Sequence, residues 1–322
     1  MQKTEDQKLY ALTLVGNGLP TDQLKEIHFF LNAKGLKIET IRRLSSPFSL
    51  KGPPQDYCLA GFDFLIRAFP DIIKGLRQAL KTICDKYGLE VCIQEEDASR
   101  QNKKLIAFDL DSTLIQMEAI DELAALAGKK QEVSRITELA MQGSLDFKQS
   151  LARRVALLKG LEKSALAQVA NSLTLTPGAQ RLIARLKNLG YKTATLSGGF
   201  TYFARLVQER LGLDYVFANE LEISENKLTG NLKGELIDGQ AKARLLKEIS
   251  AREGICLNET IAVGDGANDL PMLESAGLGI AFHPKALLKA RVEHSICHLG
   301  LDSILYFLGL KDTNPLTENQ KI

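Results

Sequence analysis

Two aspartates, Asp109 and Asp111, stand at the end of an apolar run in the stretch LIAFDLDST. A carboxylate is a competent nucleophile towards phosphorus, and a neighbouring carboxyl group can protonate a leaving alkoxide. Alternate side chains of an extended chain point to opposite sides, so the chain must turn here for both carboxylates to serve one site. The alternative interpretation is an ordinary surface turn, because aspartate is common in turns.

A second acidic cluster, GDGAND at 264–269, follows the apolar run TIAV and contains Asp265, Asn268 and Asp269. Its glycines allow the backbone to approach a ligand closely, and its carboxylates are hard oxygen ligands suited to magnesium. Taken separately, this stretch is also compatible with a turn or a calcium-like loop.

Two weaker signals lie between the acidic clusters. Ser197, Gly198 and Gly199 end the run KTATL, and Lys242 stands at the start of an amphipathic helical stretch. Small Ser-Gly loops are common and an isolated lysine is usually solvated, so neither signal identifies a site alone. Their position in the chain, between the two carboxylate clusters, is what makes them candidates.

The elements around these residues follow a regular alternation. From Leu105 onward, apolar runs at 105–111, 192–199, 215–221, 260–266 and 277–282 alternate with helical patterns at 119–170, 201–211 and 240–253. This alternation predicts an α/β domain, a doubly wound parallel sheet with helices on both faces. Ligands bind beyond the carboxyl ends of strands in such sheets, and the candidate residues fall at those ends.

The first part of the chain has a different pattern. Residues 10–44 and 57–94 each read as strand, helix, strand, and the helical pieces end at Gly35 and Gly88. This order predicts a ferredoxin-like α+β module over residues 1–96, interrupted by a Pro/Gly-rich loop at 52–54. The polar stretch 97–104 is the expected linker, and 105–322 is the expected second domain.

Composition limits the partners of the chain. Its 41 basic and 39 acidic residues are evenly spread, so we expect no nucleic-acid or membrane partner. The N-terminus is charged and no stretch is apolar for about 18 residues, which predicts a cytoplasmic protein. Five cysteines without CxxC spacing argue against a disulfide framework and a zinc site.

Taken together and in this order, the four elements resemble the signatures of the haloacid dehalogenase superfamily over about residues 103–310. The resemblance implies that Asp109 is a nucleophile that becomes phosphorylated and that Asp111 is the general acid/base. Negative charge spreads over the equatorial oxygens during phosphoryl transfer, so the remaining elements must supply positive charge and hydrogen-bond donors.

The same resemblance implies roles for those remaining elements. One Mg²⁺ per active site would be held by Asp109, the main-chain carbonyl of Asp111, and Asp265, with Asp269 in support. The phosphate would meet Ser197, the Gly198 amide, Lys242 as a catalytic positive charge, and Asn268, which reaches the transferring group or the substrate.

In this superfamily a cap inserted over the site selects the substrate, and we expect a small helical cap at about 118–172. The stretches MEAIDELA and SLDFKQSLARRV are similar to those of phosphoserine phosphatases. This implies that Glu118 meets the substrate ammonium, that Arg154 pairs with its carboxylate, and that Met141 and Phe147 wall the pocket. An acidic helix start and a solvated helix face are the alternatives, and Arg153 is the nearest competitor.

Three functions are therefore compared. The first is a phosphatase for phosphoserine in serine biosynthesis, the second an enzyme for another small phosphorylated amino or hydroxy acid. The third is an amino-acid sensor on an inactive scaffold, which the intact Asp109 and Asp111 disfavour. The N-terminal module resembles ACT-type regulatory domains, which implies possible L-serine binding and a homodimer.

Overall fold

The computed structural model describes residues 7–45, 59–141 and 144–312. They form two compact units, which are treated separately below: one contains residues up to Lys103 together with those from Arg291, and the other spans Lys104–Ala290. The loop at 52–54, Cys58 and the side chain of Met141 lie outside the described part of the chain.

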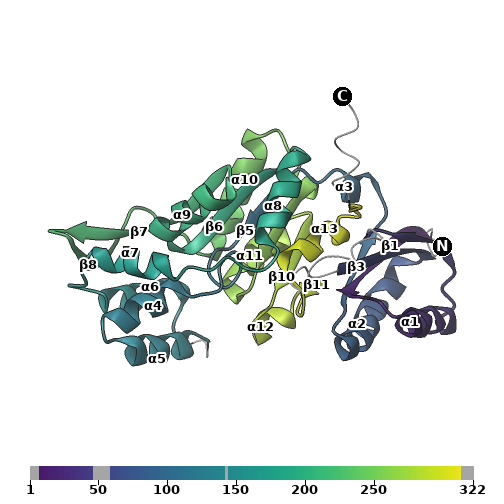
Figure 1. Ribbon diagram of the computed structural model, residues 1–322, viewed down its shortest axis with the longest axis horizontal. Helices are drawn as coiled ribbons and strands as arrows, with labels where there is room; N and C mark the ends of the chain where they lie inside the picture. The colour runs from purple at the N-terminus through teal and green to yellow at the C-terminus, as the bar shows by residue number, and fades with distance from the viewer. Residues whose placement is uncertain (1–6, 46–58, 142–143, 313–322) are drawn as a thin grey trace, which may run out of the picture. The chain divides into compact units, whose positions relative to one another are not determined.

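The first unit is built on a four-stranded antiparallel sheet with the strand order β2-β3-β1-β4. Its elements are β1 (Lys8–Asn17), α1 (Thr21–Ala33), β2 (Ile38–Arg43), β3 (Leu59–Ala68), α2 (Pro70–Tyr87) and β4 (Glu90–Glu95). Alternate residues of β1, including Leu12 and Leu14, share one hydrophobic core with Ile27 of α1 and Leu80 of α2. Both helices lie on the same side of the sheet (Figure 1). The expected order of strands and helices is therefore present.

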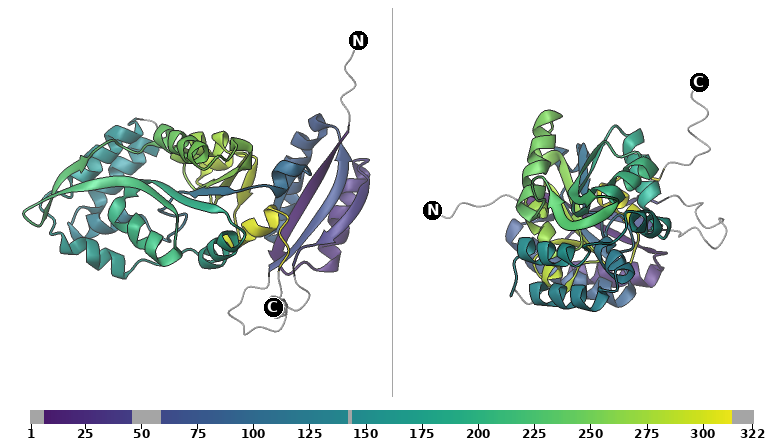
Figure 2. Two further views of the ribbon diagram at one scale, coloured as in Figure 1. Left: turned by 90° about the horizontal axis from the view of Figure 1, so that it is seen from above. Right: turned by 90° about the vertical axis from the view of Figure 1, so that its left-hand side faces the viewer.

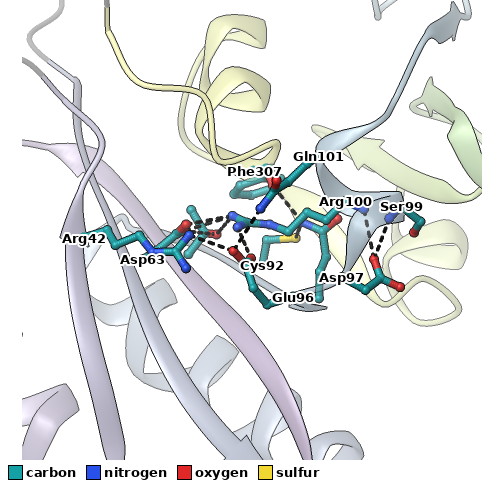
Figure 3. A network of polar contacts seen from close by, with 11 residues as sticks. Arg42, Asp63, Cys92, Glu96, Asp97, Ser99, Arg100, Gln101 and Phe307 are labelled. Carbon is teal, nitrogen blue, oxygen red and sulfur yellow. Dashed lines mark hydrogen bonds and ion pairs between the residues drawn. The ribbon is translucent and has the colours of Figure 1, made fainter.

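The stretch expected to be a polar linker contains a short helix, α3 (Ala98–Gln101), which Asp97 caps. Arg100 in this helix is only 2% exposed, and its guanidinium donates hydrogen bonds to Asp63 at 3.0 Å and Glu96 at 2.5 Å (Figure 3). A buried charge needs such partners, and they lie on β3 and just after β4. Arg100 thus holds the stretch expected to be the linker against the sheet of the first unit.

Residues from Arg291 onward also belong to the first unit, whereas the sequence assigned all of 105–322 to the second domain. The buried carboxylate of Glu90 accepts hydrogen bonds from three backbone N–H groups of residues 297–299, at 2.6 to 3.2 Å. These contacts satisfy a carboxylate that would otherwise be costly to bury. The elements of this segment are β11 (His294–Ile296), η4 (Leu301–Ser303) and α13 (Ile304–Phe307).

The second unit contains six strands in the order β10-β9-β5-β6-β7-β8, of which only β8 is antiparallel to its neighbour. The strands are β5 (Leu105–Phe108), β6 (Lys192–Phe200), β7 (Tyr215–Ser224), β8 (Lys227–Lys233), β9 (Thr260–Gly264) and β10 (Leu278–Phe282). Helices lie on both faces of this sheet (Figure 2). The predicted α/β fold with a parallel sheet is confirmed, and β5 lies at its centre between β6 and β9.

Helices fill the connections between these strands, and one helix, α12, follows the last strand. They are α4 (Ala119–Leu126), α5 (Lys130–Met141), α6 (Phe147–Ala156), α7 (Ser164–Asn171), α8 (Ala179–Asn188), α9 (Thr201–Leu211), α10 (Gly239–Arg252), η2 (Leu257–Glu259), η3 (Ala267–Asp269), α11 (Leu270–Ser275) and α12 (Ala286–Lys289). The stretch expected to form the cap holds α4 to α7. Across the described residues, no helix is long and apolar enough to cross a membrane.

Candidate active site

Asp109 directly follows the central strand β5 and is 5% exposed. Its backbone N–H donates to the carbonyl of Val263 at 2.9 Å, which extends the pairing with β9 to Asp109. Three residues later Ser112 adopts a positive φ of 57°, so the chain turns as the sequence required. The turn brings the Asp111 carboxylate to the first backbone N–H of α4, that of Ala119, at 3.0 Å.

Asp111 also lies against the glycine loop that ends β6. A Cβ atom on Gly199 would stand 2.1 Å from Asp111 Oδ2, so only glycine leaves room for this carboxylate. Burial raises the pKa of Asp111 well above its usual value, and the negative charges of Glu118 and Asp109 raise it further. This environment favours the protonated form, which a general acid requires.

Lys242, in the first turn of α10, is fully buried beside two carboxylates. Its Nζ lies 2.7 Å from Asp109 Oδ1 and 2.6 Å from Asp269 Oδ1. Burial alone lowers the pKa of Lys242, but the charges of Asp109 and Asp269 outweigh this effect and raise it above its usual value. Helix α10 is fixed at its start because the Asp238 side chain accepts the Ala241 N–H at 2.9 Å. The ammonium is therefore a permanent positive charge beside Asp109.

Three buried aspartates form a group that can hold a metal ion. Asp109, Asp265 and Asp269 each offer one carboxylate oxygen, and these oxygens all lie within 4.8 Å of one another. Burial and the charge of Asp109 raise the pKa of Asp265 to about 7 and that of Asp269 to about 6. A divalent cation would relieve this excess of negative charge, and an all-oxygen donor set fits Mg²⁺. Three of the four predicted metal residues are thus brought together, while the position of the Asp111 carbonyl in this group stays a prediction.

The side expected to receive phosphate is built from backbone turns. Ser197 is fully buried, and its Oγ accepts the N–H of Gly199 at 2.8 Å. Asn268 lies in the turn of η3, and its carbonyl oxygen would be 2.4 Å from a Cβ on Gly239 at the start of α10. The glycine at 239 therefore allows α10, which carries Lys242, to pack closely against the acidic turn at 264–269.

Two of the residues expected to select the substrate, Phe147 and Glu118, lie close to this centre. A Cβ on Gly198 would stand 2.7 Å from Phe147 Cζ, so the Phe147 ring covers the glycine loop. Glu118 accepts the Ser112 hydroxyl at 3.0 Å. Met141 ends α5, and its side chain lies outside the described residues.

Arg154 and Arg153 have different surroundings, although they are adjacent in α6. Arg154 is half-buried: burial lowers its pKa, and the charges of Glu118 and Asp121 oppose that decrease. Within the described residues, no group accepts a hydrogen bond from its buried Nε atom. Arg153 is exposed. A ligand carboxylate would satisfy the Arg154 guanidinium, whereas solvent already satisfies Arg153.

Sequence reasoning missed two residues at this site. Lys285, in the loop after β10, has its Nζ 2.9 Å from Asp265 Oδ2 and 3.0 Å from Glu118 Oε1. Asn219, at 2% exposure on β7, donates to the Gly198 carbonyl at 2.9 Å and accepts the Ile237 N–H at 2.8 Å. Lys285 gives no signal in the sequence, because it is a lone lysine beyond the last motif. Asn219 gives a weak signal, because it is a polar residue inside the apolar run YVFANEL.

Comparisons with known proteins agree with this geometry. A family model described as haloacid dehalogenase-like hydrolase matches residues 103–277. A phosphoserine phosphatase of Archaeoglobus fulgidus is 46% identical over 250 residues, which is 77% of this chain and 73% of that protein. The unliganded structure of a probable phosphoserine phosphatase from Vibrio cholerae has a TM-score of 0.74 at 35% identity, and the match covers 93% of this chain and 86% of that one. A structure described as a phospho-aspartyl intermediate analogue of phosphoserine phosphatase has a TM-score of 0.61 at 47% identity, over 64% of this chain and 99% of that one.

Proposed function

The chain belongs to the haloacid dehalogenase-like hydrolase family and is a phosphoserine phosphatase, and from this premise we propose that Asp109 is its nucleophile. The reaction converts O-phospho-L-serine to L-serine and phosphate, the last step of L-serine biosynthesis. The observation that carries the assignment is the position of Asp109 between the buried ammonium of Lys242 and the carboxylates of Asp265 and Asp269. The similar structure described as a phospho-aspartyl intermediate analogue supports the same mechanism.

In the first half-reaction the Asp109 carboxylate attacks phosphorus, and the bond between phosphorus and the serine oxygen breaks. Asp111 donates its proton to that oxygen, so that L-serine leaves as an alcohol. In the second half-reaction Asp111 takes a proton from the water that attacks the aspartyl phosphate, which returns Asp109 to a free carboxylate. The position of the Asp111 carboxylate against Gly199, in the loop expected to bind phosphate, supports this role.

Positive charge and hydrogen-bond donors stabilise the transferring group. Asp109, Asp265 and Asp269, with the main-chain carbonyl of Asp111, would hold one Mg²⁺, which would supply positive charge to offset that of the phosphoryl oxygens. Lys242 supplies a second positive charge from inside the protein. Ser197, the Gly198 amide and Asn268 complete the set as donors to phosphate or substrate.

Selection of phosphoserine rests on the cap. Glu118 receives the substrate ammonium and Arg154 the substrate carboxylate, while Phe147 and Met141 form the walls. The buried Nε of Arg154, free of protein acceptors among the described residues, supports this assignment over Arg153.

The first test is phosphate release from L-phosphoserine, L-phosphothreonine and an aryl phosphate, each with magnesium and with a chelator. We expect phosphoserine to be preferred and the activity to need magnesium. Equal turnover of the aryl phosphate would contradict the roles of Glu118 and Arg154. Full activity in the chelator would contradict the metal assignment instead.

Replacing Arg154 by lysine tests the carboxylate contact. Lysine keeps the charge but loses the planar, bidentate geometry, so KM for phosphoserine should rise about 10- to 100-fold. Turnover of an aryl phosphate, which has no carboxylate to bind, should change little. Arg153→Lys is the matched control and should leave both activities near those of the wild type. A larger effect at Arg153 would reverse the assignment.

We also propose that the first unit is an ACT-like module that pairs two chains and binds L-serine. The order β2-β3-β1-β4 of its sheet, with both helices sharing one core, supports this proposal. Sedimentation equilibrium with and without L-serine tests it: a monomer under both conditions would contradict the pairing.

A further inference from the structure

Lys285 connects two carboxylates that have different roles in the proposed reaction. Its Nζ lies 3.0 Å from Glu118 Oε1 and 2.9 Å from Asp265 Oδ2. Glu118 directly precedes α4 in the cap stretch, and Asp265 directly follows β9. One ammonium therefore joins the proposed ammonium-binding residue to a proposed metal ligand.

The backbone of Lys285 is held by hydrogen bonds, whereas its side chain is partly exposed to solvent. Its N–H donates to the Asp265 carbonyl at 3.0 Å, and its own carbonyl accepts the N–H groups of Leu288 and Lys289 in α12. The side chain is 48% exposed, so its head can move into water without the loop moving. Lysine is suited to exchanging carboxylate partners for water, because its ammonium is a compact charge at the end of a flexible chain.

Charge explains why a lysine stands at this position. Glu118 is 36% exposed and Asp265 is 5% exposed. In the proposed reaction Glu118 binds the substrate ammonium and Asp265 binds Mg²⁺. Without a positive charge between them, the two carboxylates would repel each other in the ligand-free protein. The Lys285 ammonium carries the same charge sign, and the same hydrogen-bonding capacity, as the ammonium group of phosphoserine.

We infer that Lys285 is a resident counter-ion, which neutralises Glu118 and Asp265 in the free enzyme and gives way to Mg²⁺ and to the substrate ammonium. This inference rests on the proposed function. Lys285 thereby lowers the affinity for each ligand. Lys285 also couples the binding of Mg²⁺ to the binding of substrate. When Mg²⁺ is bound at Asp265, Lys285 keeps only the exposed carboxylate of Glu118 as its partner. The substrate ammonium then displaces Lys285 from Glu118 more easily.

The test is a calorimetric titration of Mg²⁺ into the substrate-free enzyme, as wild type and as Lys285→Met. Removing the competing charge should lower the dissociation constant for Mg²⁺ about three- to tenfold. Lys285→Arg keeps the charge and should remain near the wild type. Lys247→Met removes one charge from an exposed position of α10 and controls for the change in net charge. Lys285→Gln serves as a second neutral variant, and thermal unfolding checks that each variant is folded.

Kinetics provide the second measurement. KM for phosphoserine should fall in Lys285→Met, whereas KM for 3-phosphonooxypropanoate, which lacks the ammonium, should not change. Unchanged or weaker Mg²⁺ binding in both neutral variants would overturn the inference, and so would a higher KM for phosphoserine, since Lys285 would then be a substrate contact. The magnesium titration contains no substrate, so its result is independent of whether the wild type hydrolyses phosphoserine.

Discussion

Replacing Asp109 by asparagine is expected to lower kcat for phosphoserine by about four orders of magnitude or more. An amide is not a nucleophile towards phosphorus, so the covalent step is lost rather than slowed. The exchange is nearly isosteric, and Lys242 keeps its ion pair with Asp269, so the fold should persist. Phosphate release gives the rate, and acid quenching with labelled phosphoserine shows whether label remains on the protein.

The matched control is Asp238→Asn at the start of α10. Asparagine caps helices about as well as aspartate, so this variant should keep activity near that of the wild type. Mass spectrometry must exclude deamidation of the new asparagine at position 109, which would restore the nucleophile. An intact Asp109→Asn protein with more than about 1% of the wild-type kcat would be incompatible with an aspartyl phosphate at this residue.

The second large effect is expected for Lys242→Met, in both activity and stability. Methionine fills a similar volume but leaves the buried carboxylates of Asp109 and Asp269 without their cation. Breaking a buried ion pair in this way costs about 3–5 kcal/mol, and the loss of the charge beside phosphate should lower kcat/KM by about 10³. Urea unfolding without magnesium measures the first quantity, and Lys247→Met is the exposed control.

The stability loss of this variant should depend on pH in one direction. Burial and Asp109 raise the pKa of Asp269 to about 6 even with Lys242 present. The folded state therefore holds its proton more tightly than the unfolded state, so this group destabilises the fold as pH rises from about 4 to above 6. Without Lys242 the pKa rises further, and the deficit should be larger at pH 8 than at pH 5. A deficit that is equal at both pH values would argue against unpaired carboxylates as its cause.

The positions of the main catalytic candidates were accessible from sequence because strand ends are local features. Asp109, Ser197 and Asp265 each follow or end an apolar run, and the carboxyl ends of parallel strands meet at one edge of a sheet. The alternation of strands and helices predicted that sheet. Residue type and order along the chain were therefore enough to propose both the chemistry and the elements that carry it.

The tertiary structure decided which charged side chains pair with one another. Lys242 reaches Asp269 across 27 residues, and Arg100 pairs with Asp63 across 37, although neither pair shows a periodic pattern. Lys285 had no sequence signal, since an isolated lysine is usually solvated; only the packing of its loop against the acidic turn brings it to Glu118 and Asp265. Hydrophobic periodicity indicates which face of a helix or strand is buried. A buried charge, by contrast, pairs with the oppositely charged group that the fold brings within about 3 Å of it. The sequence by itself thus determined the chemistry and the strand ends that bear it, and the tertiary structure decided which charges neutralise one another.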